Sequence, residues 1–122
     1  VVRYSNVYGF NQLPSNPYCG VIGKFIESSV KGDRIKIHGD GEQTRDYTFV
    51  DDAVEATIQA AINPRAIGQI YNIGTGVETS VKRLAEVINA ITGSSSKIEY
   101  IDKRDIDNIR KRYMNIDKIR HE

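Results

Sequence analysis

The chain has 122 residues, of which 17 are basic, 16 are acidic and 39% are hydrophobic, enough apolar side chains for one core. The formal net charge is +1 and the two signs are mostly interspersed, which argues against a nucleic-acid or membrane surface. No apolar run approaches the roughly 18 residues that a bilayer span needs, and Cys19, the single cysteine, excludes an internal disulfide. We expect a cytoplasmic protein with one domain over residues 1–122.

The first half of the sequence predicts strands, a long loop and one helix. Residues 1–4 are apolar and β-branched enough for a buried strand, whereas residues 5–18 carry Asn, Gly, Pro and Ser at the density of a loop. Residues 19–31 predict a helix that ends at Gly32. Its apolar positions at helical spacing are Val21, Ile22, Phe25, Ile26 and Val30.

A glycine turn follows this helix. Ile35 and Ile37 alternate with polar residues in a predicted strand over residues 34–38, and a second alternating strand covers residues 45–49. Between them, the sequence Gly39-Asp40-Gly41 reverses the chain.

The second half predicts two amphipathic helices and two more strands. Asp51 or Asp52 is the expected cap of a helix that Asn63-Pro64 ends, with an inward apolar stripe. The stripe consists of Val54, Ile58, Ala61 and Ile62. Strands are expected at residues 69–73 and 97–101.

Between these two strands lies the most regular helical pattern of the chain. Thr79 or Ser80 is its expected cap and Gly93 its end. Its inward residues are expected to be Val81, Leu84, Val87, Ile88 and Ile91. Asn115 is the expected cap of a last helix that the end of the chain cuts off. Strands separated by helices indicate an α/β fold, with helices on one face of a small sheet. Because the chain opens on a strand without Met and closes inside a helix, we expect a fragment truncated at both ends.

The glycine turn is the most informative polar segment. Gly39 and Gly41 permit a positive φ and a close approach of a ligand to the backbone. Arg45 presents a planar fork of donors that suits a phosphate or carboxylate. Two interpretations stay open: a diphosphate site, or a hairpin in which Arg45 pairs with Asp46, Asp40 or Glu42.

Other polar residues are weaker candidates. Arg104 and Asp107 could hold a phosphate and a ribose hydroxyl in a cleft, or lie on a solvated surface. His38 could stack on a planar ring or form a hydrogen bond beside the turn. The sequence Gly74-Thr75-Gly76 lacks the spacing of a phosphate-binding loop, so a simple turn is favoured. No nucleophile with a base, metal cluster or carboxylate pair stands out, which favours binding over catalysis.

Four segments together resemble one protein family. RYSNVYG at residues 3–9, IHGDGEQTRDYTFVDDAVEA at 37–56, IYNIGTG at 70–76 and the R-x-x-D at 104–107 match in order across nearly the whole chain. They resemble the NAD-dependent sugar-nucleotide epimerases and dehydratases of the extended short-chain dehydrogenase/reductase group. This group includes UDP-glucose 4-epimerase and dTDP-glucose 4,6-dehydratase. The resemblance implies the C-terminal substrate-binding domain of an extended Rossmann-type fold.

The resemblance also implies contacts with the nucleoside. Asn6 matches an asparagine that contacts the sugar nucleotide near its diphosphate. Val21 and Lys24 belong to a segment, residues 21–25, that lines the nucleotide pocket in the family. His38 stands where many members have a tyrosine beside the base.

For the diphosphate and ribose, the resemblance points to two further clusters. Arg45 matches the arginine that grips the diphosphate, and Tyr47 lies close by. Arg104 and Asp107 match an R-P-G-D pair that holds phosphate and ribose. Here Asp105 and Ile106 replace Pro and Gly, so the loop shape departs from the family pattern.

The cofactor and the catalytic groups of the family lie outside this sequence. Neither the G-x-x-G-x-x-G turn that binds NAD nor the catalytic Y-x-x-x-K pair occurs in the chain. The resemblance implies that NAD is bound mainly by an N-terminal half, so we expect this fragment to be inactive and to bind a UDP- or dTDP-hexose. An epimerase is favoured, with a 4,6-dehydratase, which is a lyase, and a non-catalytic nucleotide-sugar sensor as alternatives. The full-length protein is expected to be a homodimer.

Overall fold

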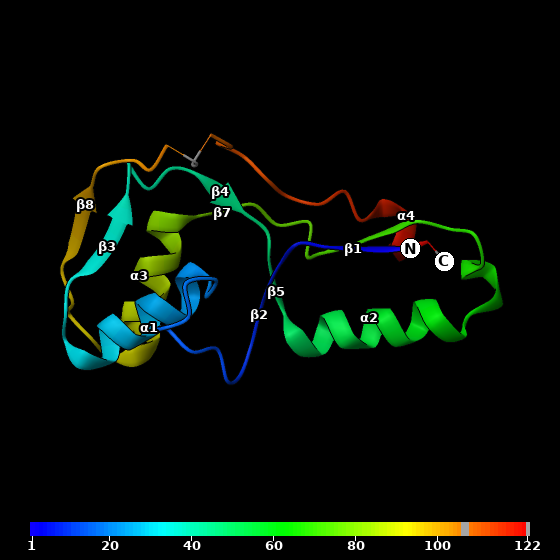
Figure 1. The fold of residues 1–122 in the computed structure, drawn as a ribbon, viewed down its shortest axis with the longest axis horizontal. Helices are drawn as coiled ribbons and strands as arrows, with labels where there is room; N and C mark the ends of the chain where they lie inside the picture. The colour runs from blue at the N-terminus through cyan, green and yellow to red at the C-terminus, as the bar shows by residue number, and fades with distance from the viewer. Residues whose placement is uncertain (106–107, 122) are drawn as a thin grey trace. The chain divides into compact units, whose positions relative to one another are not determined.

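The computed structural model describes residues 1–105 and 108–121, and the chain divides into two compact units (Figure 1). Each unit is assembled from segments that are far apart in the sequence. Unit 1 comprises Val1–Phe10, Arg45–Glu78 and Arg112–Glu122, and unit 2 comprises Asn11–Thr44 and Thr79–Lys111. Helices and short parallel strands build both units, which confirms the α/β class. The expectation of one domain over residues 1–122 stays a prediction.

Unit 1 contains two pairs of parallel strands. β1 (Val2–Tyr4) pairs with β6 (Tyr71–Ile73), and β2 (Asn6–Tyr8) pairs with β5 (Tyr47–Phe49). The loop predicted over residues 5–18 is therefore wrong at its start, where β2 lies. β2 has only three residues and is flanked by Ser and Gly, so it is too short to show a periodic pattern. Its partner strand, β5, is distant in sequence.

α2 (Val50–Ile62) lies in unit 1 and differs from its prediction. Neither Asp51 nor Asp52 caps it, because the N-cap is Phe49. Both aspartates lie in the first turn, where their negative charges interact favourably with the positive end of the helix dipole. The predicted inward stripe is also wrong, since Val54 and Ile58 are about half exposed and only Ala53 is buried in this helix. The face centred on Ala53 packs on the strands, and the stripe lies beside it.

The remaining elements of unit 1 are short. A 3-10 turn, η1 (Pro64–Ala66), follows α2, and α4 (Asp117–Arg120) follows an extended segment. The Asn115 side chain accepts a hydrogen bond of 2.9 Å from the Asp117 N–H, as a capping role predicts, although Ile116 occupies the N-cap itself. Within the described residues, no helix combines the length and apolar character that crossing a membrane requires.

Unit 2 packs two helices against a pair of parallel strands. α1 (Val21–Lys31) and α3 (Val81–Thr92) contact each other, and both contact β3 (Ile35–His38), which pairs with β8 (Ile98–Ile101). The predicted alternation in β3 is confirmed. The buried cluster of this unit consists of Phe25, Ile35, Ile37, Val81, Ala85 and Ile88.

The ends of both helices follow the sequence rules. Gly32 and Gly93 have φ of 74° and 66°, the left-handed conformation that ends a helix at glycine. The Ser80 hydroxyl accepts a hydrogen bond from the Arg83 N–H, which confirms the predicted N-cap of α3.

In the two helices of unit 2, three apolar residues of the predicted helical patterns are exposed: Ile26, Val30 and Ile91. In α1, Ser29 takes the buried position next to Val30, because its hydroxyl donates to Asn89 Oδ1 of α3 at 2.8 Å. The interface between the two helices is therefore partly polar, which helical periodicity does not reveal.

The glycine turn does not close a hairpin. β3 pairs with β8, and β5 pairs with β2, so the strands on either side of the turn have different partners. The positive φ expected at Gly39 and Gly41 is confirmed, at 77° and 78°. Two-residue strands, β4 (Thr44–Arg45) and β7 (Thr79–Ser80), complete the elements.

Candidate functional site

A hollow of about 780 Å³ in unit 2 contains four of the residues that the sequence singled out. It lies beside α1, β3, β8 and the segment after β8. Among its lining residues are Val21, Lys24, Phe25, His38, Ile101 and Arg104. Val21 and Lys24 are one helical turn apart and share a face of α1.

The pleat of β3 explains why His38 reaches this hollow. Ile35 and Ile37 point into the buried cluster, so the alternating residues Lys36 and His38 lie on the other face, and both line the hollow. One strand thus supplies the core of unit 2 and one wall of the cavity.

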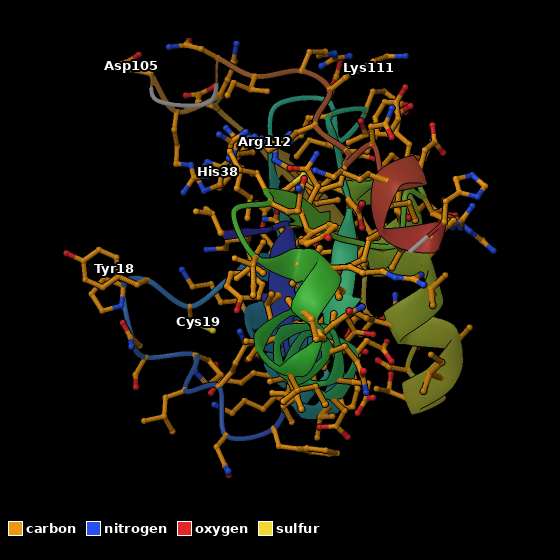
Figure 2. All side chains as sticks on the ribbon, turned by 90° about the vertical axis from the view of Figure 1, so that its right-hand side faces the viewer. Tyr18, Cys19, His38, Asp105, Lys111 and Arg112 are labelled. Atoms are coloured by element: carbon orange, nitrogen blue, oxygen red, sulfur yellow. The ribbon has the colours of Figure 1, made fainter. Side chains whose placement is uncertain are left out.

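His38 is held in one orientation. Its side chain, labelled in Figure 2, is half-buried. Its Nδ1 lies 3.0 Å from the carbonyl oxygen of Asp102. Because a carbonyl only accepts, this hydrogen bond requires the proton on Nδ1. The bond therefore fixes a flat ring at the wall of the hollow.

The hollow is mixed in charge. The lining cations are Lys24, Arg34, Lys36 and Arg104, and the lining carboxylates are Glu27, Asp33 and Glu99. Cations suit phosphate oxygens, and carboxylates accept from hydroxyl or amide donors. A ligand that carries both anionic and hydroxyl groups fits this lining better than a simple anion does.

Of the two functional residues in the R-x-x-D motif, the structure describes only Arg104. Arg104 follows β8 by three residues and lines the hollow. Asp107, its predicted partner, lies outside the described residues, as does Ile106. The interpretation of Asp107 as a ribose ligand therefore remains a prediction.

The remaining predicted residues belong to unit 1. Asn6 of β2 lies opposite Tyr47 of β5 in the parallel ladder. Burial alternates along residues 44–49, so Arg45 and Tyr47 are half-buried on one side while Asp46 is buried on the other. Arg45 and Tyr47 therefore share a side of the chain.

Tyr47 has a buried hydroxyl without a hydrogen-bond partner among the described residues. Burial raises the pKa of Tyr47 to about 12, against the smaller lowering effect of the Arg45 charge. The phenol is neutral at physiological pH. Unpaired buried polar atoms are rare, and a ligand group is one way to satisfy them.

Asp46 is the residue that the sequence analysis missed. It is 1% exposed, and its Oδ1 accepts from both the N–H and the hydroxyl of Thr75, at 2.9 and 2.6 Å. Its Oδ2 accepts from the N–H groups of Gly76 and Met114, at 2.9 and 3.2 Å. The sequence signal for its burial was the alternating pattern of residues 44–49, which places Asp46 on the same side of the chain as the buried residues Thr44 and Thr48.

These bonds settle the role of the loop at residues 74–76. The N–H groups of Thr75 and Gly76 point at a carboxylate of the same unit. They do not fit the phosphates of NAD, which would need the same donors. The prediction of a simple turn is confirmed.

The two aspartates proposed as hairpin partners of Arg45 have well-defined bonds elsewhere. Asp46 accepts the hydrogen bonds described above, and Asp40 accepts two hydrogen bonds of 2.7 Å from Arg110. The glycine turn is thus tied to the segment after β8.

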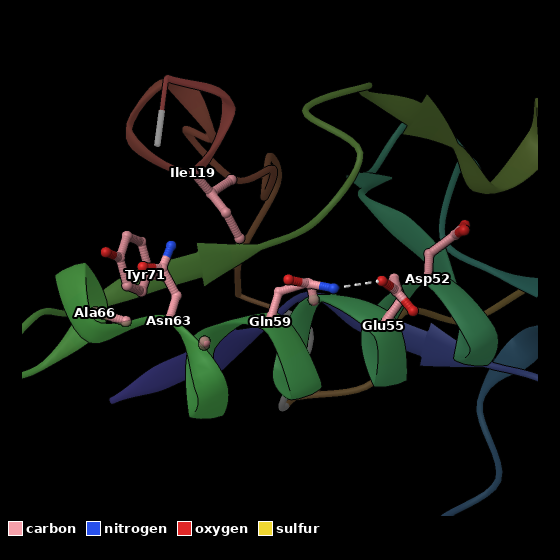
Figure 3. A pocket seen from close by; sticks show the side chains of 9 residues that line it. Asp52, Glu55, Gln59, Asn63, Ala66, Tyr71 and Ile119 are labelled. Atoms are coloured by element: carbon pink, nitrogen blue, oxygen red, sulfur yellow. Dashed lines mark hydrogen bonds between the residues drawn. The ribbon is translucent and has the colours of Figure 1, made fainter.

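A second hollow, of about 390 Å³, lies in unit 1 and contains none of the predicted residues (Figure 3). α2 contributes polar side chains, Asp52, Glu55 and Gln59, together with two alanines, and Gln59 donates to Glu55 Oε1 at 2.9 Å. Tyr71 and Ile119 supply apolar surface. Nothing in this lining gathers cations for a phosphate.

A model of the NAD dependent epimerase/dehydratase family matches residues 1–74. The chain belongs to this family. The motifs at residues 3–9 and 37–56 lie within the matched region, so the family resemblance seen in the sequence is confirmed.

Individual members of the family are similar over most of the chain. It is 46% identical over 101 residues to UDP-N-acetyl-alpha-D-glucosaminuronate decarboxylase of Bacillus cytotoxicus, covering 83% of this chain and 31% of the relative. It is 44% identical over 96 residues to UDP-glucose 4-epimerase of Mycolicibacterium smegmatis, covering 79% and 30%.

A solved structure agrees with this picture. The crystal structure of UDP-glucose 4-epimerase from Thermotoga maritima with UDP-glucose matches with a TM-score of 0.88 and 36% identity, over 98% of this chain and 38% of that chain. The chain therefore spans about a third of the length of the relatives that it matches.

Proposed function

We propose that this chain holds the nucleoside diphosphate of a UDP-hexose in an NAD-dependent epimerase of the UDP-glucose 4-epimerase type. The observation that carries the proposal is the hollow of unit 2. Val21, Lys24, His38 and Arg104 were selected from motifs alone, and all four line it. The names of the similar proteins support UDP as the nucleotide.

Each lining group has a role that follows from its chemistry. Arg104 forms charge-assisted hydrogen bonds with phosphate oxygens, and Lys24 adds a second cation. His38, fixed by its bond to Asp102, offers its ring face to the base. Val21 supplies apolar contact beside the ring.

The residues of unit 1 keep the role that the family resemblance implies, which is contact with the diphosphate. Arg45 and Tyr47 share one side of the chain, and the unpaired Tyr47 hydroxyl is a ready donor for a phosphate oxygen. Asn6 supplies an amide opposite Tyr47.

Holding the nucleotide contributes to catalysis at a distance. Binding energy from an unreactive part of a substrate positions the reacting carbon, here C4 of the hexose. In this proposal the chain supplies that anchor. The proposal keeps NAD bound mainly by an N-terminal half, as the family resemblance implies, and does not use the loop at residues 74–76, whose N–H groups donate to Asp46.

The test is isothermal titration of the protein with UDP-glucose, dTDP-glucose and UDP. We expect saturable binding of UDP-glucose, weakened by about 1.5–3 kcal/mol in Arg45→Ala and in Arg104→Ala, as for a charge-assisted hydrogen bond. Arg83→Ala is the matched control, because it removes an arginine that pairs with Glu86 and does not line the hollow.

The same titration separates the alternatives. Tighter binding of dTDP-glucose than of UDP-glucose would favour a 4,6-dehydratase. The sensor alternative is tested in the full-length protein supplied with NAD, where binding of UDP-glucose without conversion of the sugar would favour it. Equal affinity of Arg45→Ala, Arg104→Ala and wild type for UDP would refute the proposed anchor.

A further inference from the structure

An ion pair ties the glycine turn to the segment that carries Arg104. The Arg110 guanidinium donates from Nη1 to Oδ1 and from Nη2 to Oδ2 of Asp40, both at 2.7 Å. The Glu42 N–H donates to Asp40 Oδ1 at 3.0 Å, which orients the carboxylate toward the arginine. Such two-pronged geometry is the strong and directional form of an arginine–carboxylate pair.

Backbone bonds fasten the same segment on both sides of Arg104. Before it, the Gly39 N–H donates to the Ile101 carbonyl at 2.8 Å, next to the His38–Asp102 bond. After it, the Thr44 N–H donates to the Arg110 carbonyl at 2.8 Å. Ile101, three residues before Arg104, and Arg110, six residues after it, are thus both bonded to the segment at residues 39–44.

The segment also packs closely against the turn. A Cβ built on Gly39 would lie 3.9 Å from Lys103 Cβ, at ordinary contact distance. A small hollow of about 170 Å³ lies here, lined in part by His38, Lys103 and Arg110. His38 lines this hollow and the larger one, so the ion pair and the nucleotide hollow share a wall.

We propose that Asp40 and Arg110 form a clasp that positions Arg104 for the nucleoside diphosphate, without either residue contacting the ligand. The inference rests on the proposed function and adds two positioning residues to it. Immobilising a charged side chain costs conformational entropy when a ligand binds, and a clasp that restricts the backbone near Arg104 beforehand lowers this cost. Affinity for the nucleotide therefore depends on an ion pair outside the hollow.

The experiment is a titration with UDP of wild type, Asp40→Ala, Arg110→Ala and the exchanged pair Asp40→Arg/Arg110→Asp. Exposed ion pairs are individually weak, so we expect each single variant to bind about three- to fivefold more weakly. The exchanged pair, which restores the attraction in reverse, should recover most of the wild-type affinity. Arg83→Ala, which breaks an exposed pair on α3, should bind as wild type does.

The exchanged pair distinguishes positioning from direct contact. If Arg110 touched the phosphates itself, the double variant would place a carboxylate against them and bind more weakly than Arg110→Ala, which would overturn the clasp. Unchanged affinity in both single variants would overturn it as well. Thermal unfolding of each variant, measured in parallel, shows that the affinities refer to folded protein.

A failure of the clasp is distinguishable from a failure of the proposed function. In the first case wild type binds UDP and Arg104→Ala weakens binding, while Arg110→Ala has no effect. In the second case Arg104→Ala itself leaves the affinity unchanged.

Discussion

The two units of the chain are stabilised in different ways. Unit 2 buries a contiguous set of apolar side chains around Ile35 and Ile37, which are 0% and 1% exposed. Unit 1 is organised around the carboxylate of Asp46, which receives four hydrogen bonds, while much of the apolar surface of α2 is exposed. The first kind of core follows from periodicity, and the second depends on a single polar side chain.

The difference bears on where binding groups lie. In unit 2 the core and the hollow of about 780 Å³ use opposite faces of β3, so a well-packed strand orients His38. In unit 1 the buried side of residues 44–49 carries Asp46, and the opposite side carries Arg45 and Tyr47. In each unit, the proposed binding residues thus lie on the opposite side of a strand from the residues that stabilise the unit.

The largest effect is expected from the apolar core of unit 2. Ile37→Ala should lower the free energy of unfolding by about 2–5 kcal/mol, because it removes buried methyl groups and leaves a cavity. Urea unfolding followed by circular dichroism measures this loss. Ile91→Ala is the control on α3, where the side chain is 80% exposed and a change within about 0.5 kcal/mol is expected. Similar losses in the two variants would contradict the assignment of the core.

A smaller but still large effect is expected at the polar centre of unit 1. Asp46→Asn keeps the shape of the side chain but replaces one acceptor oxygen with an amide, so two of the four donors lose their partner. We expect a loss of about 2–3 kcal/mol in unfolding free energy. The comparison variant is Asp51→Asn, at an exposed position in the first turn of α2, with an expected loss below about 1 kcal/mol. Equal losses would show that Asp46 is not the organising group.

The sequence predicted most of unit 2 because its elements obey local rules. Ser80, Gly32 and Gly93 mark the helix ends by capping chemistry, and the alternation of Ile35 and Ile37 gives the buried face of β3. Local sequence patterns do not specify which strand pairs with which. The hairpin, one of the two interpretations of the glycine turn, is therefore wrong, and β2 was missed.

The candidate site likewise contains residues that sequence motifs identify and residues that they do not. Arg45, Tyr47, Arg104 and His38 were selected by motif, and the hollow of unit 2 contains the last two. Asp46 and the pair of Asp40 with Arg110 were not found, because their roles depend on residues about 30 to 70 positions away. A charged residue in a turn has the same local pattern whether its partner is water or a distant arginine.

The smallest effect is expected from the exposed pair at the edge of unit 2. The hydrogen bonds from Arg110, followed by the one from the Glu42 N–H, lower the pKa of Asp40 to about 2. A folded pKa below the unfolded value means that the stabilising contribution of the pair is fully present above about pH 4 and is lost as the pH falls toward 2. In Arg110→Ala the pKa of Asp40 should rise toward its ordinary value of 3.8.

Carboxyl carbon chemical shifts, followed by NMR from about pH 6 to about pH 2, measure this pKa in wild type and in Arg110→Ala. The same midpoint in both proteins would show that Arg110 does not hold Asp40 in solution. The clasp would then lack its ion pair, even if the backbone bonds of Gly39 and Thr44 kept the segment in place. A lower midpoint in wild type, together with weaker UDP binding in Arg110→Ala, would instead link one exposed ion pair to the affinity for UDP.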